Sequence, residues 1–187
     1  MTEQTLEIAV DKTVPSFTLL AGGEALSNGA VIEDSRPVVL SLQATDGLSG
    51  VASQGMTVDG QAYQEGVPLI WAGQLGTHTI GIWVEDHAGN RIQVTVTVQV
   101  TTSPASITKL IDAYEAAGEL GHAIASQLRN NMMQAVHHWY AGQKTQALKS
   151  LDDFLKHMDN TAHQSQITAQ ARAALAADIG ALRQMWE

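Results

Sequence analysis

The sequence has no cysteine, few aromatic residues and no long apolar run. The absence of Cys from its 187 residues excludes disulfide bonds and thiol nucleophiles, but it does not fix the cellular compartment. No window reaches the roughly 18 unbroken apolar residues of a membrane helix, so membrane insertion is not expected. The first residues, Met1-Thr2-Glu3-Gln4, lack the basic and apolar regions of a signal peptide. What remains is a chain without cysteine chemistry and without an obvious membrane anchor.

Positive charge is also scarce, and it is unevenly distributed. The formal net charge is −9. Residues 1–103 hold 3 Lys or Arg against 11 Asp or Glu, whereas residues 104–187 hold 7 against 8. An acidic surface repels phosphate groups, so nucleic acid and anionic membranes are not expected partners. The acidic first half is compatible with bound cations.

Up to about Val100 the sequence is typical of β-structure. Val, Thr and Ile dominate, and apolar residues alternate with polar ones in residues 38–44, 80–84 and 91–100. Such alternation places every second side chain on one face of a strand. Asp59-Gly60, between two short strand patterns, is typical of a hairpin turn. Several short antiparallel strands with this patterning predict an all-β, immunoglobulin-like sandwich over residues 11–101.

After a linker expected at residues 102–105, the composition changes to Ala, Leu, Met and Gln at helical spacing. Four apolar stripes follow one another, and Gly118 and Gly142 end the first two as C-caps. The stripes consist of Ile107, Leu110, Ile111 and Tyr114; Ile124, Leu128, Met132, Val136 and Trp139; Ala147, Leu148, Leu151, Phe154, Leu155 and Met158; and Ile167, Ala171, Leu175, Ile179, Leu182 and Trp186. Residues 106–187 are therefore expected to form an all-α bundle of about four helices, which makes the chain multi-domain.

The first ten residues allow two interpretations. Thr5–Val10, followed by Pro15, repeats the pattern of Thr95–Val100, followed by Pro104. Residues 1–10 are therefore expected to be the end of a preceding module or a linker, with Met1 an added start. The alternative is that they form the first strand of the sandwich itself.

Two resemblances to known families follow from these segments. Asp11-Lys-Thr-Val-Pro15, Ala44–Val51, Val58-Asp-Gly60, Gly76–Ile80 and Glu85-Asp-His-Ala-Gly-Asn90 occur in an order that resembles bacterial Ig-like repeats. Leu110–Tyr114, Gly118-Glu-Leu120, Leu128, Gly142-Gln143, Ala147, Leu151–Leu155 and Leu182–Trp186 resemble the FIMAH-type domain of secreted Bacillus- and Paenibacillus-like enzymes. The resemblance implies a secreted, extracellular parent protein with an upstream catalytic domain and a C-terminus near Glu187.

No catalytic signature is present in the sequence. It lacks His-Glu-x-x-His, Gly-x-Ser-x-Gly, a phosphate-binding loop and a dinucleotide fingerprint. Asp152 and Asp153 are adjacent on a helix, so their carboxylates diverge by about 100° and cannot flank one bond. The chain itself is therefore not expected to be an enzyme.

A calcium site is the sharpest chemical hypothesis. In an immunoglobulin topology, the start of the first strand and two connecting loops meet at one end of the sandwich. Asp11, Asp46, Asp86 and Asn90 fall in these segments, and carboxylate and amide oxygens are the ligands that Ca²⁺ prefers. The alternative is that Asp46 and Asp86 only cap their own turns.

Aromatic residues give the binding hypothesis. If Ile80, Ile82 and Val84 face inward, Trp83 lies outward between hydroxyl and amide side chains, with Gly81 leaving space beside it. An apolar ring with polar neighbours suits a sugar. The candidate glycan-binding residues are Trp83, Thr79, Glu85, Thr95, Thr97 and Trp71. The alternative is that Trp83 packs against another module.

Together these patterns predict a non-catalytic C-terminal accessory region of a secreted polysaccharide-degrading enzyme. It would bind glycan through the Ig-like face, and the acidic charge favours a neutral glycan. The alternative is a spacer, or a module that docks a protein or cell-envelope component and has no sugar affinity. Apart from a structural Ca²⁺ ion, no cofactor is expected.

Overall fold

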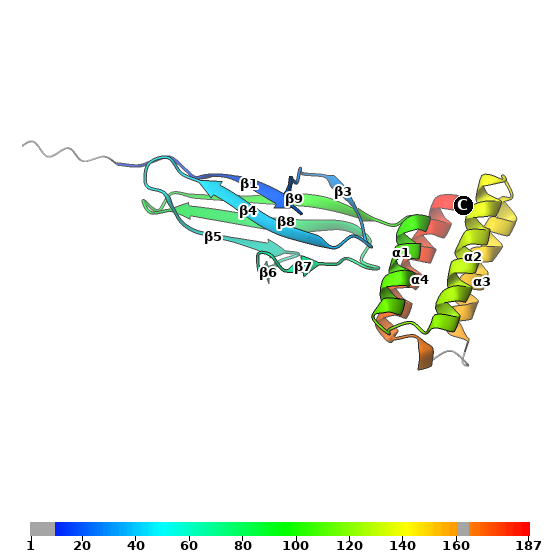
Figure 1. Ribbon diagram of the computed structural model, residues 1–187. Helices are drawn as coiled ribbons and strands as arrows, with labels where there is room; N and C mark the ends of the chain where they lie inside the picture. Colours follow the sequence, from blue (N-terminus) through cyan, green and yellow to red (C-terminus); the bar gives the residue numbers. More distant parts are fainter. Residues whose placement is uncertain (1–9, 161–164) are drawn as a thin grey trace, which may run out of the picture. The chain divides into compact units, whose positions relative to one another are not determined.

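A computed structural model of the protein describes residues 10–160 and 165–187 (Figure 1). The expected continuation of a preceding module at residues 1–10 therefore lies almost entirely outside the described residues. These described residues form first nine strands and then four helices. The strands are β1 (Ser16–Ala21), β2 (Glu24–Ala25), β3 (Ala30–Glu33), β4 (Val38–Thr45), β5 (Val51–Val58), β6 (Gln61–Tyr63), β7 (Pro68–Leu69), β8 (Gly76–Asp86) and β9 (Arg91–Thr101).

The strands form two sheets, as the alternation predicts. One sheet has the order β2-β1-β4-β7 and the other has the order β3-β9-β8-β5-β6. The alternating apolar residues of β4, β8 and β9 are buried between the sheets, among them Leu40, Ile82 and Val98. The predicted hairpin joins β5 to β6, where Val58 pairs with Gln61. Its two turn residues, Asp59 and Gly60, have φ of 49° and 79°, which is the conformation of a type I′ turn.

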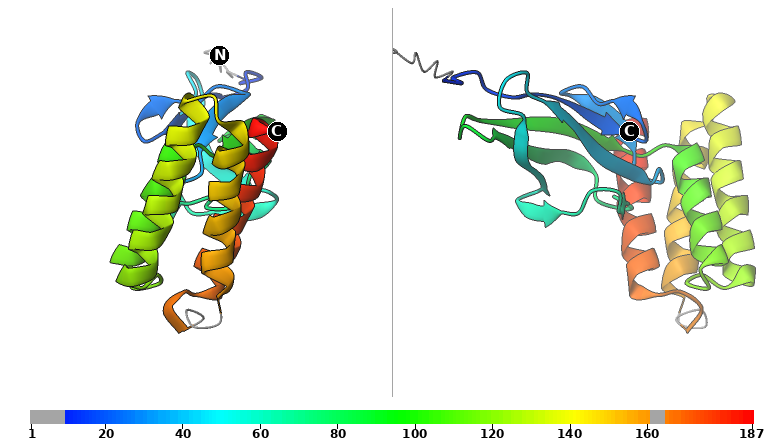
Figure 2. Two further views of the ribbon diagram at one scale, coloured as in Figure 1. Left: turned by 90° about the vertical axis from the view of Figure 1, so that its right-hand side faces the viewer. Right: turned by 60° about the vertical axis from the view of Figure 1, so that its left-hand side comes forward.

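The helices are α1 (Pro104–Ala116), α2 (His122–Tyr140), α3 (Lys144–Asp159) and α4 (Ala169–Trp186). Ser103 caps the start of α1, because its Oγ accepts a hydrogen bond from the backbone N–H of Ser106 at 3.0 Å. The four apolar stripes meet in one buried cluster, which confirms the helical bundle. Within it the rings of Trp139 and Trp186 are stacked with centroids 4.7 Å apart. The fold is therefore a β-sandwich followed by a helical bundle (Figure 2). None of the helices in the described residues is long and apolar enough to cross a membrane.

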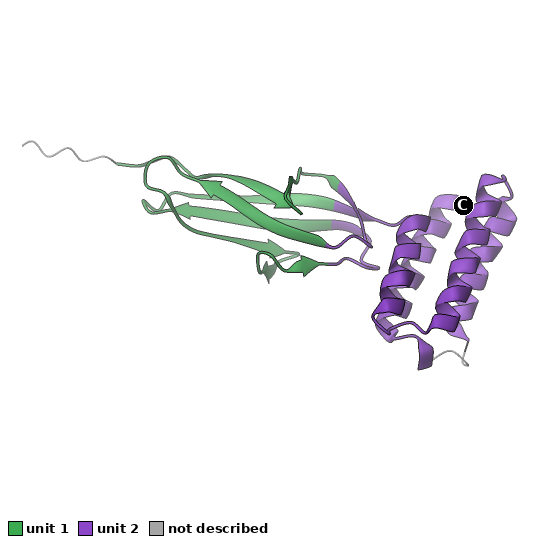
Figure 3. Ribbon diagram, in the orientation of Figure 1, with its two compact units in different colours: residues 1–30, 38–69, 78–98 green, residues 31–37, 70–77, 99–187 purple. Residues whose placement is uncertain are grey.

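Two compact units divide the chain, and their boundary differs from the change in secondary structure (Figure 3). The first contains residues 10–30, 38–69 and 78–98. The second contains residues 31–37, 70–77 and 99–187, so three segments of the β-half group with the helices. That residues 11–101 and residues 106–187 are two independent domains therefore stays a prediction.

The extra segments of the second unit are held by specific contacts. Asp34, which follows β3, accepts a hydrogen bond from Ser106 Oγ of α1 at 2.6 Å. Gly73 lies against α4, where a Cβ atom added to it would approach Ala174 Cα to 2.4 Å. These contacts leave no room for a larger residue at position 73 and bury the side chain of Ser106.

Candidate metal centre and candidate ligand face

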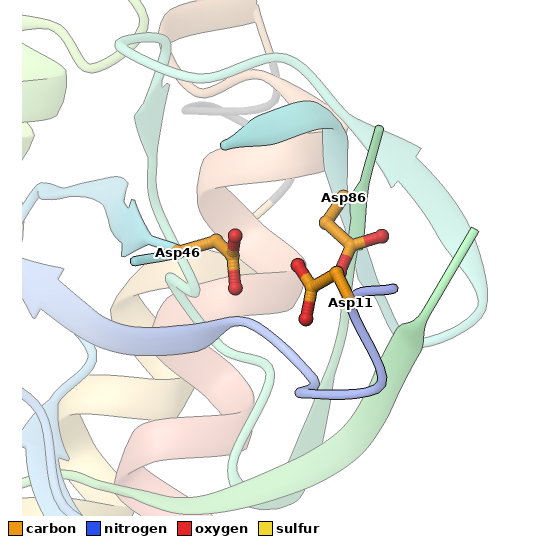
Figure 4. A group of neighbouring side chains, drawn as sticks. All are labelled: Asp11, Asp46 and Asp86. Atoms are coloured by element: carbon orange, nitrogen blue, oxygen red, sulfur yellow. The ribbon is translucent and has the colours of Figure 1, made fainter. Parts of the chain in front are cut away.

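Three aspartates from separate segments of the first unit lie together (Figure 4). Asp11 precedes β1, Asp46 follows β4 and Asp86 ends β8. One carboxylate oxygen from each lies within 4.8 Å of those of the other two. The fold therefore brings together the three carboxylates that the sequence placed at one end of the sandwich.

Two of these carboxylates also cap their own turns. Oδ1 of Asp46 accepts hydrogen bonds from the backbone N–H groups of Leu48, Ser49 and Gly50 at 3.1, 2.8 and 2.8 Å. Oδ1 of Asp86 accepts the backbone N–H of Asn90 at 2.8 Å, and a second bond comes from the backbone of the intervening loop. Local capping, the alternative to a metal role, is thus observed.

Asp11 links the segment before β1 to both loops. Its Oδ2 accepts the backbone N–H of Ser49 at 3.1 Å, in the loop after β4. Its backbone carbonyl accepts a hydrogen bond from Nδ2 of Asn90 at 3.3 Å, in the loop after β8. The three segments are therefore connected to one another through Asp11.

Hydrogen bonds keep the carboxylates of Asp11 and Asp86 ionised. The backbone N–H of Thr13 and then the bond to Ser49 lower the pKa of Asp11. Burial raises the pKa of Asp86, but the hydrogen bonds from Asn90 and from the backbone of Ala88 together lower it by more, so its net shift is downward. At neutral pH, negative charges therefore lie close together and repel one another.

The donor set fits a hard cation in part. Among the described residues, every hydrogen bond to the Asp46 carboxylate ends on Oδ1, which leaves Oδ2 for a cation. Carboxylate oxygens are the ligands that Ca²⁺ prefers. Asn90, expected as a fourth ligand, instead turns its amide nitrogen inward and donates to Asp86 Oδ2 at 2.8 Å. In this arrangement Asn90 orients Asp86, and the three carboxylates would hold the ion.

The candidate glycan face is centred on Trp83, which is half-buried on β8. The indole lies over Gly55 of the neighbouring strand β5, where an added Cβ atom would meet Nε1 at 2.7 Å. The guanidinium of Arg91 lies over the ring, with Cζ 4.7 Å from the centroid, and pairs with Glu85 at 3.7 Å. A sugar that stacks on the covered side of Trp83 therefore has to displace Arg91, and a cation–π contact of this kind is worth about 1 kcal/mol.

The threonines expected beside Trp83 differ in whether their hydroxyl groups are already hydrogen-bonded. Thr79 Oγ1 donates to Asp59 at 3.3 Å, and Thr97 Oγ1 donates to Asn28 Oδ1 at 2.9 Å. Thr95 is exposed on β9. The space expected beside Gly81 is filled, since a Cβ atom there would meet Oγ1 of Thr57 at 2.5 Å.

Trp71 does not belong to this face. Its side chain is only 1% exposed, and it lies in the second unit, in the segment between β7 and β8. A fully buried indole cannot stack on a ligand at the surface, so the structure gives Trp71 a packing role.

A groove that the sequence patterns did not predict lies on the helical bundle between α1 and α2. Its volume is about 650 Å³, and it is lined largely by apolar side chains. At its rim, Met133 is 64% exposed and Tyr140 is 85% exposed. Met133 directly follows Met132 of the apolar stripe of α2 and therefore lies outside that stripe. This extra apolar residue was the feature of the sequence that could have indicated the groove.

Comparison with known families supports one of the two resemblances. No curated protein matches the chain. Residues 104–184, which span α1 to α3 and most of α4, match the FIMAH domain, an accessory-type domain.

Proposed function

We propose that this chain is a non-catalytic accessory region of a larger secreted polysaccharide-degrading enzyme. The match to the accessory-type FIMAH domain supports this role for the helical part. The chemistry of the β-half supports it too, because the acidic cluster at Asp11, Asp46 and Asp86 has the donor set of a cation site. In this role the chain positions a catalytic domain near its polysaccharide.

Within that role, the β-sandwich acts as a connector stiffened by calcium. The observation that carries this proposal is the meeting of three carboxylates from the entering segment and two loops. A Ca²⁺ ion there would neutralise their repulsion and join Asp11 to the body of the sandwich. The direction in which the chain enters the sandwich would then be fixed.

Calcium is expected to stabilise the protein, and Asp46→Asn is expected to remove the effect. At a Ca²⁺ concentration 100 times its Kd, binding to the folded state alone adds about 2.7 kcal/mol to the free energy of unfolding. Asn at position 46 keeps an oxygen for the turn but loses the charge that a cation needs. The measurement is the melting temperature of both proteins with Ca²⁺ and with a chelator.

Glu24→Gln provides the control, because Glu24 is an exposed acid on β2, away from the cluster. It should leave the calcium-dependent shift in melting temperature unchanged. If the melting temperature of wild-type protein is the same with Ca²⁺ and with a chelator, the proposal that calcium stiffens the connector is wrong. An equal shift in the Asp46→Asn variant would place the calcium elsewhere.

A second candidate function is the binding of a neutral glycan at Trp83. The position of the indole across Gly55 favours it, since the ring presents an aromatic surface to a sugar once Arg91 is displaced. We expect neutral polysaccharide in a native gel to retard the wild-type chain weakly. Trp83→Ala should lose the retardation, because stacking is removed.

Arg91→Ala separates glycan stacking from other uses of this face. Removal of the guanidinium uncovers the ring, so stacking should become stronger and retardation should increase. If no neutral polysaccharide retards any of the three proteins, the chain has no sugar affinity at this face. The role that remains is a spacer whose helical groove docks a protein or cell-envelope component.

A further inference from the structure

Two acidic side chains of the second unit are completely buried. Asp34, in the loop between β3 and β4, and Asp178, in α4, each have 0% exposed surface. Asp34 receives two donors: Ser106 Oγ at 2.6 Å on Oδ1, and the backbone N–H of Gly73 at 3.3 Å on Oδ2. Both oxygens of Asp178 are buried without a hydrogen-bond donor. The two carboxyls thus have very different surroundings.

No basic group compensates this pair. The ion pairs in the described part of the chain involve other acids, and none includes Asp34 or Asp178. Tyr114 of α1 interacts with both carboxyls, and it also interacts with Glu119 of the α1–α2 connection. Burial, followed by Glu119, Asp178 and Asp34, raises the pKa of Tyr114 to about 12. Among the described residues, the titratable groups that interact with the pair are therefore acidic.

Gly73, whose backbone N–H donates to Asp34, lies against Ala174, one helical turn before Asp178 on α4, and the two acidic side chains interact electrostatically. Two buried carboxyl groups placed in this way cannot both be ionised in such surroundings. If both were carboxylates, neither could donate to the other, and Asp178 would remain without a partner. A single proton changes this, because a protonated Asp178 donates its O–H to Asp34. The negative charge then stays on Asp34, where Ser106 and Gly73 already donate to it.

We propose that Asp34 and Asp178 form a binding site for one proton, and that this proton fastens the β3–β4 loop to α4. Asp178 carries the proton and Asp34 is the carboxylate that accepts its hydrogen bond. The site is independent of the proposed glycan and calcium sites, which lie in the first unit.

The titration of Asp178 agrees with this arrangement. Burial, followed by the charge of Asp34, raises the pKa of Asp178 from its ordinary value of 3.8 to about 9. Between these values the unfolded chain releases the proton and the folded chain retains it. The contribution of this proton to stability is therefore complete below about pH 4 and is lost as the pH rises toward 9. The attachment of the loop weakens in alkaline solution.

Asp178→Asn tests the site, because the amide donates to Asp34 without a proton that can be lost. For wild-type protein, the folding equilibrium constant should fall by up to tenfold per pH unit between pH 5 and 9. The variant should lose most of this slope and be more stable than wild type at pH 8. Asp112→Asn, which removes an exposed acid of α1, should keep the wild-type slope.

A second measurement does not depend on the folding of a variant. The carboxyl ¹³C signal of Asp178 in wild-type protein should titrate several pH units above those of exposed aspartates. A normal titration of Asp178 below pH 5 would overturn the proposal, as would a wild-type pH slope in Asp178→Asn. Stability that depends on an added metal ion instead of pH would also overturn it, because the pair would then hold a metal.

Discussion

Replacement of Gly73 by alanine is expected to lower the free energy of unfolding of the second unit by about 3 kcal/mol or more. A Cβ atom at this position would lie 2.4 Å from Ala174 Cα and 2.8 Å from its Cβ. The obstacle is helical backbone, which cannot rotate away as a flexible side chain can. Gly73 also has φ of 70°, a conformation that alanine adopts only at a cost. Denaturant unfolding followed by the helical circular dichroism signal measures the loss.

The same substitution at Gly66 separates the two causes. Gly66 has φ of 84° but no atom within 4 Å of an added Cβ, so Gly66→Ala suffers backbone strain alone. We expect it to cost about 1 kcal/mol. If both variants lose equal stability, the close approach of residue 73 to α4 contributes nothing. The grouping of residues 70–77 with the helices would then have no energetic basis at this contact.

The sequence predicts the elements of this fold well because local periodicity determines them. The alternation in residues 91–100 became β9, Asp59-Gly60 became a hairpin turn, and the four apolar stripes became one bundle core. The compact units depend instead on tertiary contacts. Nothing local to Asp34 or Gly73 indicates that one bonds Ser106 or that the other approaches Ala174. Such contacts between residues far apart in the sequence were therefore not predictable from its patterns.

The candidate sites show the same limit at the level of single side chains. Topology was enough to bring Asp11, Asp46 and Asp86 together. It was not enough to orient the amide of Asn90, whose nitrogen donates to the Asp86 carboxylate and to the backbone carbonyl of Asp11. Spacing alone also could not show that Thr57 fills the space beside Gly81. The sequence therefore predicts where in the fold a residue lies, but not the direction in which its side chain points.

Trp71→Ala is expected to lower the free energy of unfolding by about 3–5 kcal/mol. The side chain is 1% exposed, so its removal takes a large apolar surface out of the interior and leaves a cavity. Trp71 also begins the turn that carries Gly73, closed by a hydrogen bond from the backbone N–H of Gln74 to the carbonyl of Trp71 at 2.8 Å. A cavity beneath this turn should loosen its attachment to α4. Denaturant unfolding measures the effect.

Trp83→Ala is the matched control, because it removes the same side chain from a half-buried position on the outer face. We expect it to cost less than Trp71→Ala, about 1–2 kcal/mol, since Trp83 is only partly buried. A glycan-binding role for Trp71 requires the opposite ranking, with a small loss of stability and a large loss of sugar retention. If Trp71→Ala loses much stability but is retarded by polysaccharide as strongly as wild type, Trp71 is a residue of the interior. Trp83 is then the aromatic residue available for sugar recognition.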